Sequence, residues 1–232
     1  MSPVMVITGT RKGIGRHLVD YYRKQGYVIA GCSRAPMEET VDGYRHYCLD
    51  VADEAAVQDM VFDVVKREGR IDVLVNNAGI ASMNHCLLTP LGTVTNVFST
   101  NVFGTFLFSR EVAKAMVKAK SGRIVNFATV ATPLKLEGEM AYAASKAAVK
   151  SMTEIMAKEL APFHITVNGV GPTPVKTDLI RGVSDEKIKA LIGTQAVKRM
   201  GEYRDITNVI DFFIRPESDF ITGQTVYLGG IS

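Results

Sequence analysis

Tyr142 and Lys146 are the two residues whose types and spacing point most directly to chemistry. They lie in residues 141–161, a stretch rich in Ala, Met, Lys, Glu and Leu that is followed directly by Pro162, and this composition predicts a helix. Residues four apart share one helix face. A phenol has a pKa of about 10, and a nearby ammonium lowers that pKa by stabilising the phenolate. The pair is therefore a candidate for proton transfer near neutral pH, although the same spacing is also common in surface pairs.

A glycine-rich turn follows the first predicted strand, residues 4–8, and precedes a predicted helix over about residues 16–25. Its glycines have G-x-x-x-G-x-G spacing and stand at Gly9, Gly13 and Gly15. In such units the glycines permit a tight turn, a close approach of backbone to a pyrophosphate, and close helix packing. The helix N-terminus then faces the phosphates. The alternative is an ordinary glycine-containing loop, which the flanking strand and helix disfavour.

The end of the second predicted strand, residues 27–32, bears on the choice of dinucleotide. An acidic residue there typically binds the ribose 2′-hydroxyl of NAD. Here the strand is followed by Ser33 and Arg34, with no acid. Arg34 could pair with a 2′-phosphate, and Lys12 in the glycine turn could reach the same group. Two cations and no carboxylate favour NADP, unless both cations are merely solvated.

The remaining elements alternate along the chain, which predicts an α/β fold. Further strands are expected at residues 44–49, 71–75, 123–129, 165–170 and 225–228, and further helices at about residues 53–68, 90–120 and 205–214. Alternating strands and helices indicate a mostly parallel sheet with right-handed crossovers. We therefore expect residues 1–232 to form a single Rossmann-type, doubly wound domain, with a seven-stranded sheet covered by helices on both faces.

Three polar positions carry alternatives that the sequence leaves open. Asp50 follows the third strand and could accept a hydrogen bond from an adenine amino group, or it could cap the helix that starts near Asp53. The stretch from Asn76 to Gly79 follows the fourth strand, where open α/β sheets bind ligands. Asn101 is unfavourable inside a helix, so it is either a tolerated residue on a solvated face or the mark of a kink that exposes a backbone carbonyl.

Composition excludes several functional classes. The 232 residues are 47% hydrophobic and 22% charged, with a net charge of +3, which is typical of a soluble globule and too small to favour nucleic acid or a membrane surface. The three cysteines have no CxxC spacing, which favours reduced thiols in the cytoplasm and no metal site. We expect neither secretion nor membrane spanning, because there is no leader pattern and no long apolar run.

Together these residues resemble the short-chain dehydrogenase/reductase family over essentially the whole chain. The pattern is most similar to 3-oxoacyl-[acyl-carrier-protein] reductases and small carbonyl reductases. Five motifs stand in family order: TGTRKGIG at Thr8 to Gly15, NNAG at Asn76 to Gly79, Asn101, the Tyr142/Lys146 pair, and the tail segments KRMGE and FITGQ at residues 198–202 and 220–224.

The resemblance implies NADPH-dependent reduction of a ketone, either a 3-oxoacyl thioester or another apolar carbonyl compound. It implies that Tyr142 is the general acid, that Lys146 lowers its pKa and bonds the nicotinamide ribose, and that Asn101 holds a water linking Lys146 to solvent. Thr129, thirteen residues before Tyr142, stands where the family usually has a serine that bonds the substrate carbonyl. Because its β-branch restricts χ1, we expect an active enzyme with an altered pocket.

The resemblance also implies a cofactor site built from the glycine turn and the ends of several strands. Asn77 and Gly79 would line the adenosine-side ribose and the cofactor floor, and Thr177 with the backbone of Val175 would bind the nicotinamide carboxamide. Thr173 replaces the usual Gly after Pro172 and is expected close to the nicotinamide. The full expected set is Gly9, Arg11, Lys12, Gly13, Ile14, Gly15, Ser33, Arg34, Asp50, Val51, Asn77, Ala78, Gly79, Tyr142, Lys146, Pro172, Val175 and Thr177.

Substrate contacts are expected from the segment after NNAG, the loop before Tyr142 and the segment after the sixth strand. Residues 176–200 are expected to act as a mobile lid that contains a short helix from Ser184. Such a lining would be apolar and would suit an apolar substrate. Its members are Met83, His85, Leu87, Leu134, Leu136, Met140, Thr173, Leu179, Ile180 and Ile192.

The carrier and the assembly remain open at this level. Carrier-protein reductases tend to have a basic residue just before the sixth strand, where this chain has Phe163 and His164. Lys118, Lys120 and Arg123 could still dock an acidic carrier, but this docking surface is incomplete, so a free or coenzyme-linked ketone stays open as the alternative. The resemblance implies a homotetramer or dimer. The rival hypotheses are a non-catalytic NADP-binding sensor or scaffold, and a dehydrogenase of the same fold.

Overall fold

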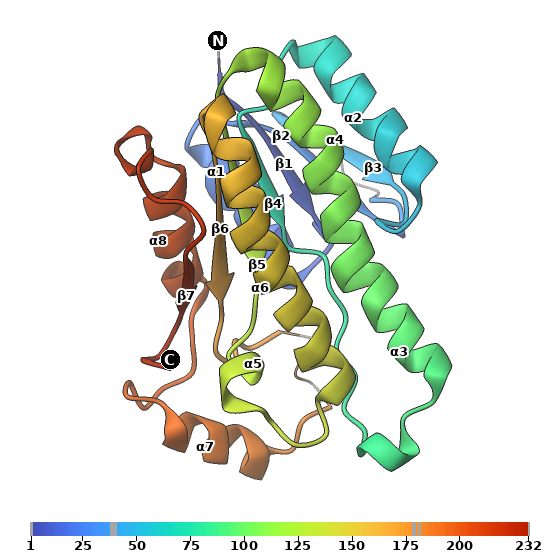
Figure 1. Ribbon diagram of the computed structural model, residues 1–232, viewed down its shortest axis with the longest axis vertical. Helices are drawn as coiled ribbons and strands as arrows, with labels where there is room; N and C mark the ends of the chain where they lie inside the picture. The colour runs from blue at the N-terminus through green and yellow to red at the C-terminus, as the bar shows by residue number, and fades with distance from the viewer. Residues whose placement is uncertain (1, 38–40, 178–179, 181, 232) are drawn as a thin grey trace.

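Figure 1 shows the computed structural model, which describes residues 2–37, 41–177, 180 and 182–231. One sheet runs through the middle, and its strands have the order β3-β2-β1-β4-β5-β6-β7. All six pairings between neighbouring strands are parallel. The predicted doubly wound, seven-stranded sheet is thus confirmed within the described residues. Its strands are β1 (Val4–Thr8), β2 (Val28–Ser33), β3 (Tyr44–Cys48), β4 (Val73–Asn76), β5 (Gly122–Phe127), β6 (Ile165–Gly171) and β7 (Thr225–Tyr227).

Helices cover both faces of the sheet, as parallel strands require because their apolar residues point to both sides. On one face, α2 (Glu54–Glu68), α4 (Gly104–Ala119) and α6 (Met140–Leu160) pack on one apolar core. On the other face, α1 (Gly13–Lys24) and α8 (Tyr203–Ile214) pack on a second core. The strand β1, which lies between β2 and β4, is buried along its whole length. In Figure 1, α4 and α6 cross in front of the strands.

The strand order places the candidate site. The chain moves outward from β1 to β3 and then crosses back to β4, so the direction of winding reverses between the adjacent strands β1 and β4. Ligands of open α/β sheets bind at the carboxyl ends of strands at such a reversal. The short elements α5 (Ala131–Leu134) and α7 (Asp185–Thr194) lie at this end of the sheet in Figure 1.

The predicted helix over residues 90–120 is interrupted. The structure has α3 (Leu91–Phe98), then the π-helical turn η2 (Ser99–Phe103), and then α4. The interruption follows from Asn101, whose buried side chain bonds a neighbouring loop and not solvent. The first helix also begins earlier than predicted, at Gly13, because the glycine turn itself is already helical there. The other short elements are η1 (Cys86–Leu88), η3 (Ala161–Phe163) and η5 (Pro216–Ser218).

Among the described residues, no helix is both long enough and apolar enough to cross a bilayer.

Two tyrosines of α1 bind one carboxylate of α8. Tyr21 donates to Asp211 Oδ2 at 2.7 Å, and Tyr22 donates to Asp211 Oδ1 at 2.8 Å. Tyr22 is 1% exposed, and its burial together with the Asp211 charge raises its pKa above the ordinary value. These two bonds fix the first helix against the last one, and with it the glycine turn that precedes the first helix.

Replacing Tyr22 by Phe is therefore expected to destabilise the fold. A hydrogen bond to a charged group contributes about 1.5–3 kcal/mol, so Tyr22→Phe should lower the free energy of unfolding in urea by about 2 kcal/mol. Tyr21→Phe is the matched control and should cost less, because Tyr21 is less buried. Without the Tyr21 hydroxyl, Asp211 still accepts from the buried Tyr22. An unchanged urea midpoint for Tyr22→Phe would show that this contact does not hold the two helices together.

Candidate active site

The helix α6 carries Lys146 into the interior of the protein. Lys146 is 3% exposed, and its Nζ donates to the carbonyl of Phe127, the last residue of β5, at 2.8 Å. Burial disfavours the ammonium and lowers the pKa of Lys146 to about 8. Tyr142, four residues earlier, is half-buried on the same helix. The surface-pair alternative for these two residues is therefore wrong.

Tyr142 keeps its proton at neutral pH. Burial raises the pKa of Tyr142 to about 12, a hydrogen bond with Thr129 opposes this rise, and the negative charge of Glu139 adds to it. This is the opposite of the lowered pKa expected from sequence, because the loss of water around the phenolate outweighs its hydrogen bond. A protonated phenol is the form that can donate a proton.

Thr129 is oriented toward Tyr142 by its own backbone surroundings. It is 7% exposed, and its Oγ1 accepts a hydrogen bond from the amide of Ala131 at 3.2 Å. With that acceptor site in use, the hydroxyl hydrogen is available for the Tyr142 oxygen, in line with the lowering effect of Thr129 on the Tyr142 pKa. The threonine thus retains the hydroxyl that the usual serine would supply.

Asn101 is fully buried and connects three segments. Its Nδ2 donates to the carbonyl of Ile80 and to Ser145 Oγ, each at 2.9 Å, and its Oδ1 accepts from the amide of Ile80 at 2.9 Å. Ser145 precedes Lys146 on α6. A Cβ placed on Gly79 would lie 3.2 Å from Asn101 Oδ1 and 3.4 Å from Lys146 Nζ, so both polar groups flank this glycine. The solvated-face alternative for Asn101 is wrong.

The glycine turn packs tightly on the end of β4. Gly9 has φ +73°, and a Cβ there would lie 2.9 Å from the Cα of Ala78. A Cβ on Gly15 would lie 2.1 Å from the carbonyl oxygen of Gly9, so a side chain is excluded at either position. Asn77 holds the turn in place, because its Nδ2 donates to the carbonyls of Thr8 and Gly9 at 2.8 and 3.1 Å.

The start of α1 has the properties of an anion site. Its first turn, Gly13 to Arg16, carries no carboxylate, and Lys12 at the N-cap position has an ammonium that can only donate. The amides at such an N-terminus attract phosphate. Thr177 lies over this turn, since a Cβ on Gly13 would be 3.6 Å from Thr177 Cγ2. Arg11 and Lys12 are exposed beside it. These residues fit the diphosphate of a dinucleotide, and Ile14 packs beneath them on the second core.

Ser33 is the last residue of β2, one residue beyond the predicted strand, and Arg34 follows it directly. Arg34 is exposed, so its guanidinium is accessible to a phosphate. The hydroxyl of Ser33 already donates to the carbonyl of Ala35 at 2.8 Å and lies 3.1 Å from His46 Nε2. Ser33 therefore shapes this loop in addition to any contact with a ligand.

Asp50 does not cap the following helix, and that alternative is wrong. Asp53 is the N-cap residue of α2, accepting from the amide of Ala56 at 3.1 Å. Asp50 instead accepts from the amide of Ala52 at 2.9 Å and remains exposed. Val51, also expected at the cofactor, has a side chain that is 6% exposed and packs in the first core, so only its backbone is available to a ligand.

The side chain of Thr173 is held by the segment after α7. It is 6% exposed and donates through Oγ1 to Gln195 Oε1 at 2.8 Å. A Cβ on Gly201 would lie 2.9 Å from Thr173 Cγ2. The side chain thus faces the C-terminal segment and fastens the end of α7 to the end of β6. Nearby, Pro172 accepts from the amide of Val130 at 3.3 Å, and the buried Val175 forms a bridge with Gly201.

The three segments expected to line the substrate site converge in part. Lys187 on α7 lies 3.7 Å, Nζ to Sδ, from Met83, and the amide of Asn84 donates to the carbonyl of Gly138 at 2.8 Å. Met140 is exposed, at 46%. Leu134, Leu136, Ile180 and Ile192 are half-buried, whereas His85 and Leu87 are exposed. His85 accepts from the amide of Leu87 within its own loop, at 3.4 Å, and Leu179 lies outside the described residues.

Sequence reasoning missed two polar residues near the site. Glu139 stands at the N-cap of α6, three residues before Tyr142, and burial raises its pKa. His46 on β3 contacts both residues that flank Arg34. The alternation of β3 carried a signal for His46, because Tyr44, His46 and Cys48 must share one face of an edge strand.

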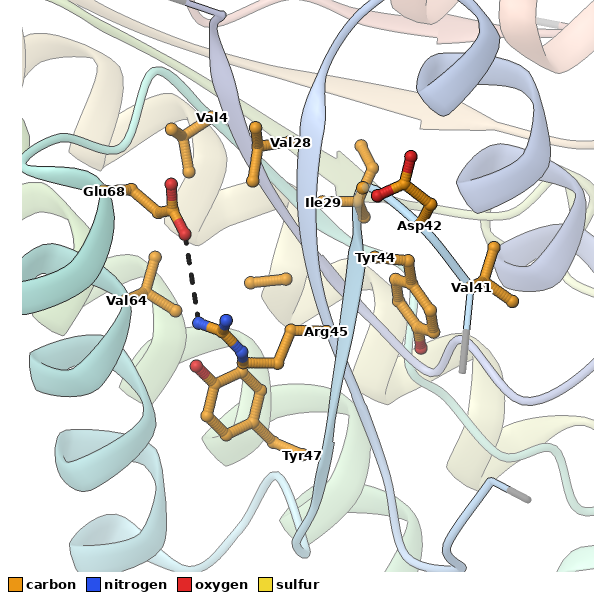
Figure 2. Close-up of a pocket in the computed structure, with 12 residues that line it drawn as sticks. Val4, Val28, Ile29, Val41, Asp42, Tyr44, Arg45, Tyr47, Val64 and Glu68 are labelled. Carbon is orange, nitrogen blue, oxygen red and sulfur yellow. Dashed lines mark ion pairs between the residues drawn. The ribbon is translucent and has the colours of Figure 1, made fainter. Parts of the chain in front are cut away.

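A separate hollow lies at the opposite end of the sheet. It has a volume of about 400 Å³. Val4 and Val28, at the beginnings of their strands, line it (Figure 2). Arg45 and Glu68 form an ion pair across it at 3.9 Å. None of its lining residues belongs to the expected site. Because ligands of this fold bind at the carboxyl ends of strands, the candidate active site is the Tyr142 region.

Two relatives with known names are similar in sequence to almost the whole chain. A 3-oxoacyl-[acyl-carrier-protein] reductase FabG from Staphylococcus epidermidis is 32% identical over 99% of this chain and 98% of its own length. The FabG of Vibrio cholerae is 29% identical over 98% of this chain and 96% of its own.

Solved structures agree in fold. The structure titled ElxO with NADP bound has a TM-score of 0.89 and 29% identity, covering 98% of this chain and 97% of its own. A ligand-free aldohexose dehydrogenase from Thermoplasma acidophilum also has a TM-score of 0.89, with 28% identity over 99% of this chain and 94% of its own. The family model described as short chain dehydrogenase matches residues 3–188. The chain therefore belongs to the short-chain dehydrogenase family of oxidoreductases.

Proposed function

We propose that this protein is an NADPH-dependent reductase that converts a ketone to a secondary alcohol, with Tyr142 as the proton donor. The observation that carries the proposal is the hydrogen bond between Thr129 and the protonated Tyr142, with the buried ammonium of Lys146 one helical turn away and bonded to the last carbonyl of β5. The NADP-bound relative and the reductase names of the curated relatives support it.

The cofactor would supply a hydride to the carbonyl carbon, and the protein's residues do the rest. The turn from Gly9 to Gly15 and the start of α1 would hold the diphosphate. Arg34 and Lys12 would bind the 2′-phosphate, since both are exposed cations at that end of the site. Gly79, with no side chain, leaves space beside Lys146.

Tyr142 would protonate the carbonyl oxygen as negative charge develops on it. Its raised pKa keeps the phenol protonated at neutral pH. On substrate binding, the hydroxyl hydrogen of Thr129 would turn from Tyr142 to the same oxygen and hold the carbonyl in reach. The proton lost by Tyr142 would be replaced from Lys146, whose pKa of about 8 makes its ammonium a better donor than an ordinary lysine.

Asn101 would complete the proton route to solvent. The π-turn η2 widens the helix at this residue, and such turns frequently accompany functional sites. The Asn101 side chain is held by Ile80 and Ser145, while its carbonyl accepts from Thr105 Oγ1 at 2.8 Å. A carbonyl has two lone pairs, so a relay water can occupy the second.

The substrate class that fits best is an apolar ketone that is free or coenzyme-linked, with 3-oxoacyl thioesters favoured by the names of the relatives. Arg123 stands at the start of β5, and Lys120 ends the preceding helix. Arg123 stands four residues before Phe127 and so lies about 13 Å along the strand from its catalytic end, and Lys120 precedes the strand. They are poorly placed to dock an acidic carrier beside Tyr142.

The reductase proposal is tested by NADPH oxidation at 340 nm against acetoacetyl thioesters, small diketones, quinones and bulky cyclic ketones. Tyr142→Phe should lower kcat by roughly 10²–10⁴-fold. Thr129→Val, which loses the hydroxyl at similar volume, should lower kcat at least about tenfold, and Thr129→Ser is the control that keeps the hydroxyl. Full turnover by Tyr142→Phe would remove Tyr142 from the mechanism.

Tight NADPH binding without turnover of any ketone would favour the rival hypothesis, a cofactor-binding sensor or scaffold on the same fold.

Glu139 is expected to tune Tyr142 through its charge. Because that charge raises the Tyr142 pKa, Glu139→Gln should lower it. Alcohol oxidation needs the Tyr142 phenolate, so the kcat for oxidation at pH 8 should rise in Glu139→Gln. A lowering of the Tyr142 pKa by half a unit would raise it about threefold. Glu137→Gln, two residues away and exposed, is the matched control. A fall in oxidation kcat specific to Glu139→Gln would contradict this role.

We also propose that the protein assembles as a homotetramer through the face formed by η2, α4 and α6. Exposed apolar side chains gather on these elements: Phe103 is 54%, Phe106 42% and Ile155 53% exposed. Small residues on α6, Ala147 and Ser151, are also exposed and permit close packing of helices. Exposed apolar side chains that gather on neighbouring helices favour a protein interface.

Light scattering at micromolar concentration should therefore give about four times the chain mass of 25.3 kDa. Phe106→Glu should reduce the mass, because it introduces a charge into the interface. A monomer mass for the unaltered protein would contradict the assembly.

A further inference from the structure

A chain of polar side chains connects β3 to the glycine turn. Tyr44 and His46 are two apart on β3, so both point to the same face of the sheet. The Tyr44 hydroxyl lies 2.7 Å from Thr10 Oγ1 and 2.8 Å from His46 Nδ1. The contact depends on Gly31 of β2, because a Cβ there would lie 2.6 Å from Thr10 Cγ2 and 2.8 Å from Tyr44 Cε2. The glycine turn and the edge strand are thereby joined.

The other side of the His46 ring holds the loop that contains Arg34. His46 Nε2 lies 3.1 Å from the carbonyl oxygen of Ala35 and 3.1 Å from Ser33 Oγ. Ser33 and Ala35 are the two neighbours of Arg34 in the chain. The backbone of Arg34 is held as well, since Cys48 Sγ donates to its carbonyl at 3.3 Å. His46 therefore bridges the two segments that carry the exposed cations at the 2′-phosphate end of the site.

This network accepts His46 in either charge state. A carbonyl only accepts, so Nε2 carries a hydrogen toward Ala35. With a neutral ring, Nδ1 accepts from the Tyr44 hydroxyl, and the Thr10 hydroxyl donates to Tyr44. With a protonated ring, Nδ1 donates to Tyr44, Tyr44 donates to Thr10, and Thr10 donates to the carbonyl of Cys32, which lies at 3.3 Å. Protonation thus reverses the direction in which the two hydroxyl groups donate, and it leaves no polar group of the network unpaired.

The charges around His46 determine which state prevails. Burial lowers the pKa of His46, and the bond to the Ala35 carbonyl opposes that effect. On α1, Arg16 pairs with Asp20 at 3.2 Å, and both act on Tyr44. The described titratable and charged groups at this end of the sheet include Lys12, Arg16, Asp20, Cys32, Arg34, Tyr44, Cys48 and Asp50. The cations among them disfavour a charged imidazole, whereas a phosphate dianion at Arg34 would favour it.

We propose that His46 is a specificity-determining and positioning residue of the cofactor site, and that its ring gains a proton when a 2′-phosphorylated adenine nucleotide binds beside Arg34. The inference rests on the proposed NADPH preference. By linkage, whatever favours the protonated ring on binding must also make binding tighter when the ring is protonated. Discrimination between NADPH and NADH should then depend on pH, and this dependence should require His46.

The test uses 2′,5′-ADP, which carries the 2′-phosphate, and ADP, which does not. The C2 proton of His46 is followed by NMR from pH 5 to 8.5 and is assigned by its absence in His46→Gln, since the chain has only four histidines. We expect 2′,5′-ADP to raise the His46 pKa by at least about half a unit, which corresponds to about threefold tighter binding to the protonated form. ADP should leave the His46 pKa unchanged.

A second measurement compares dissociation constants by fluorescence. The phosphate itself titrates with a pKa of about 6, and this changes NADPH binding in both proteins. We therefore divide the NADPH affinity of the unaltered protein by that of His46→Gln, which cancels the effect of the phosphate. This ratio should rise about threefold or more from pH 8.5 to 6, whereas the NADH ratio should stay flat. Tyr44→Phe, which removes the Thr10 contact and keeps His46, should reduce NADPH affinity and retain the pH dependence.

Two results would overturn the proposal, and they are distinguishable. If 2′,5′-ADP binds far more tightly than ADP while the His46 pKa does not move, then His46 has no such role and the NADPH preference stands. If 2′,5′-ADP binds no more tightly than ADP, then the NADPH preference itself is wrong, and the role of His46 is wrong with it.

Discussion

Holding a lysine ammonium inside the protein is the constraint on which the site depends. Burying a charge is costly unless it is hydrogen-bonded, and the carbonyl of Phe127 at the end of β5 supplies that bond. This fixes α6 against the centre of the sheet and brings Tyr142 over the same strand end. The interruption of the long helix at Asn101 serves the same arrangement, because its side chain ties Ser145, the neighbour of Lys146, to the loop after β4.

A second constraint is the close approach of backbones around the glycine turn. Gly9, Gly15 and Gly31 each lie where an added Cβ would collide with a neighbouring segment. The same closeness brings Thr10, Tyr44 and His46 into one network. The binding end and the catalytic end are therefore built differently: the first from backbone and glycine, and the second from buried side chains on a helix.

Much of this arrangement follows from local sequence. The first strand was predictable to the residue, and the mostly parallel sheet follows from the alternation of strands and helices. The Tyr142 pair, the glycine turn and Arg34 stand where their motifs indicated. What local sequence could not predict depends on contacts between distant segments. Thr173 turns to Gln195, twenty-two residues on, and the Tyr142 pKa rises because burial, which no motif reports, outweighs its neighbours.

The most direct test of the account is the pKa of Lys146, since both the buried site and its proton route depend on it. The Nζ resonance of Lys146 in the ¹⁵N-lysine-labelled protein can be identified by its loss in Lys146→Met and titrated by NMR. If the ammonium is buried, its pKa should be about 8, well below the ordinary 10.5. Titration at the ordinary value would mean that the ammonium is hydrated, and would contradict a buried proton donor behind Tyr142.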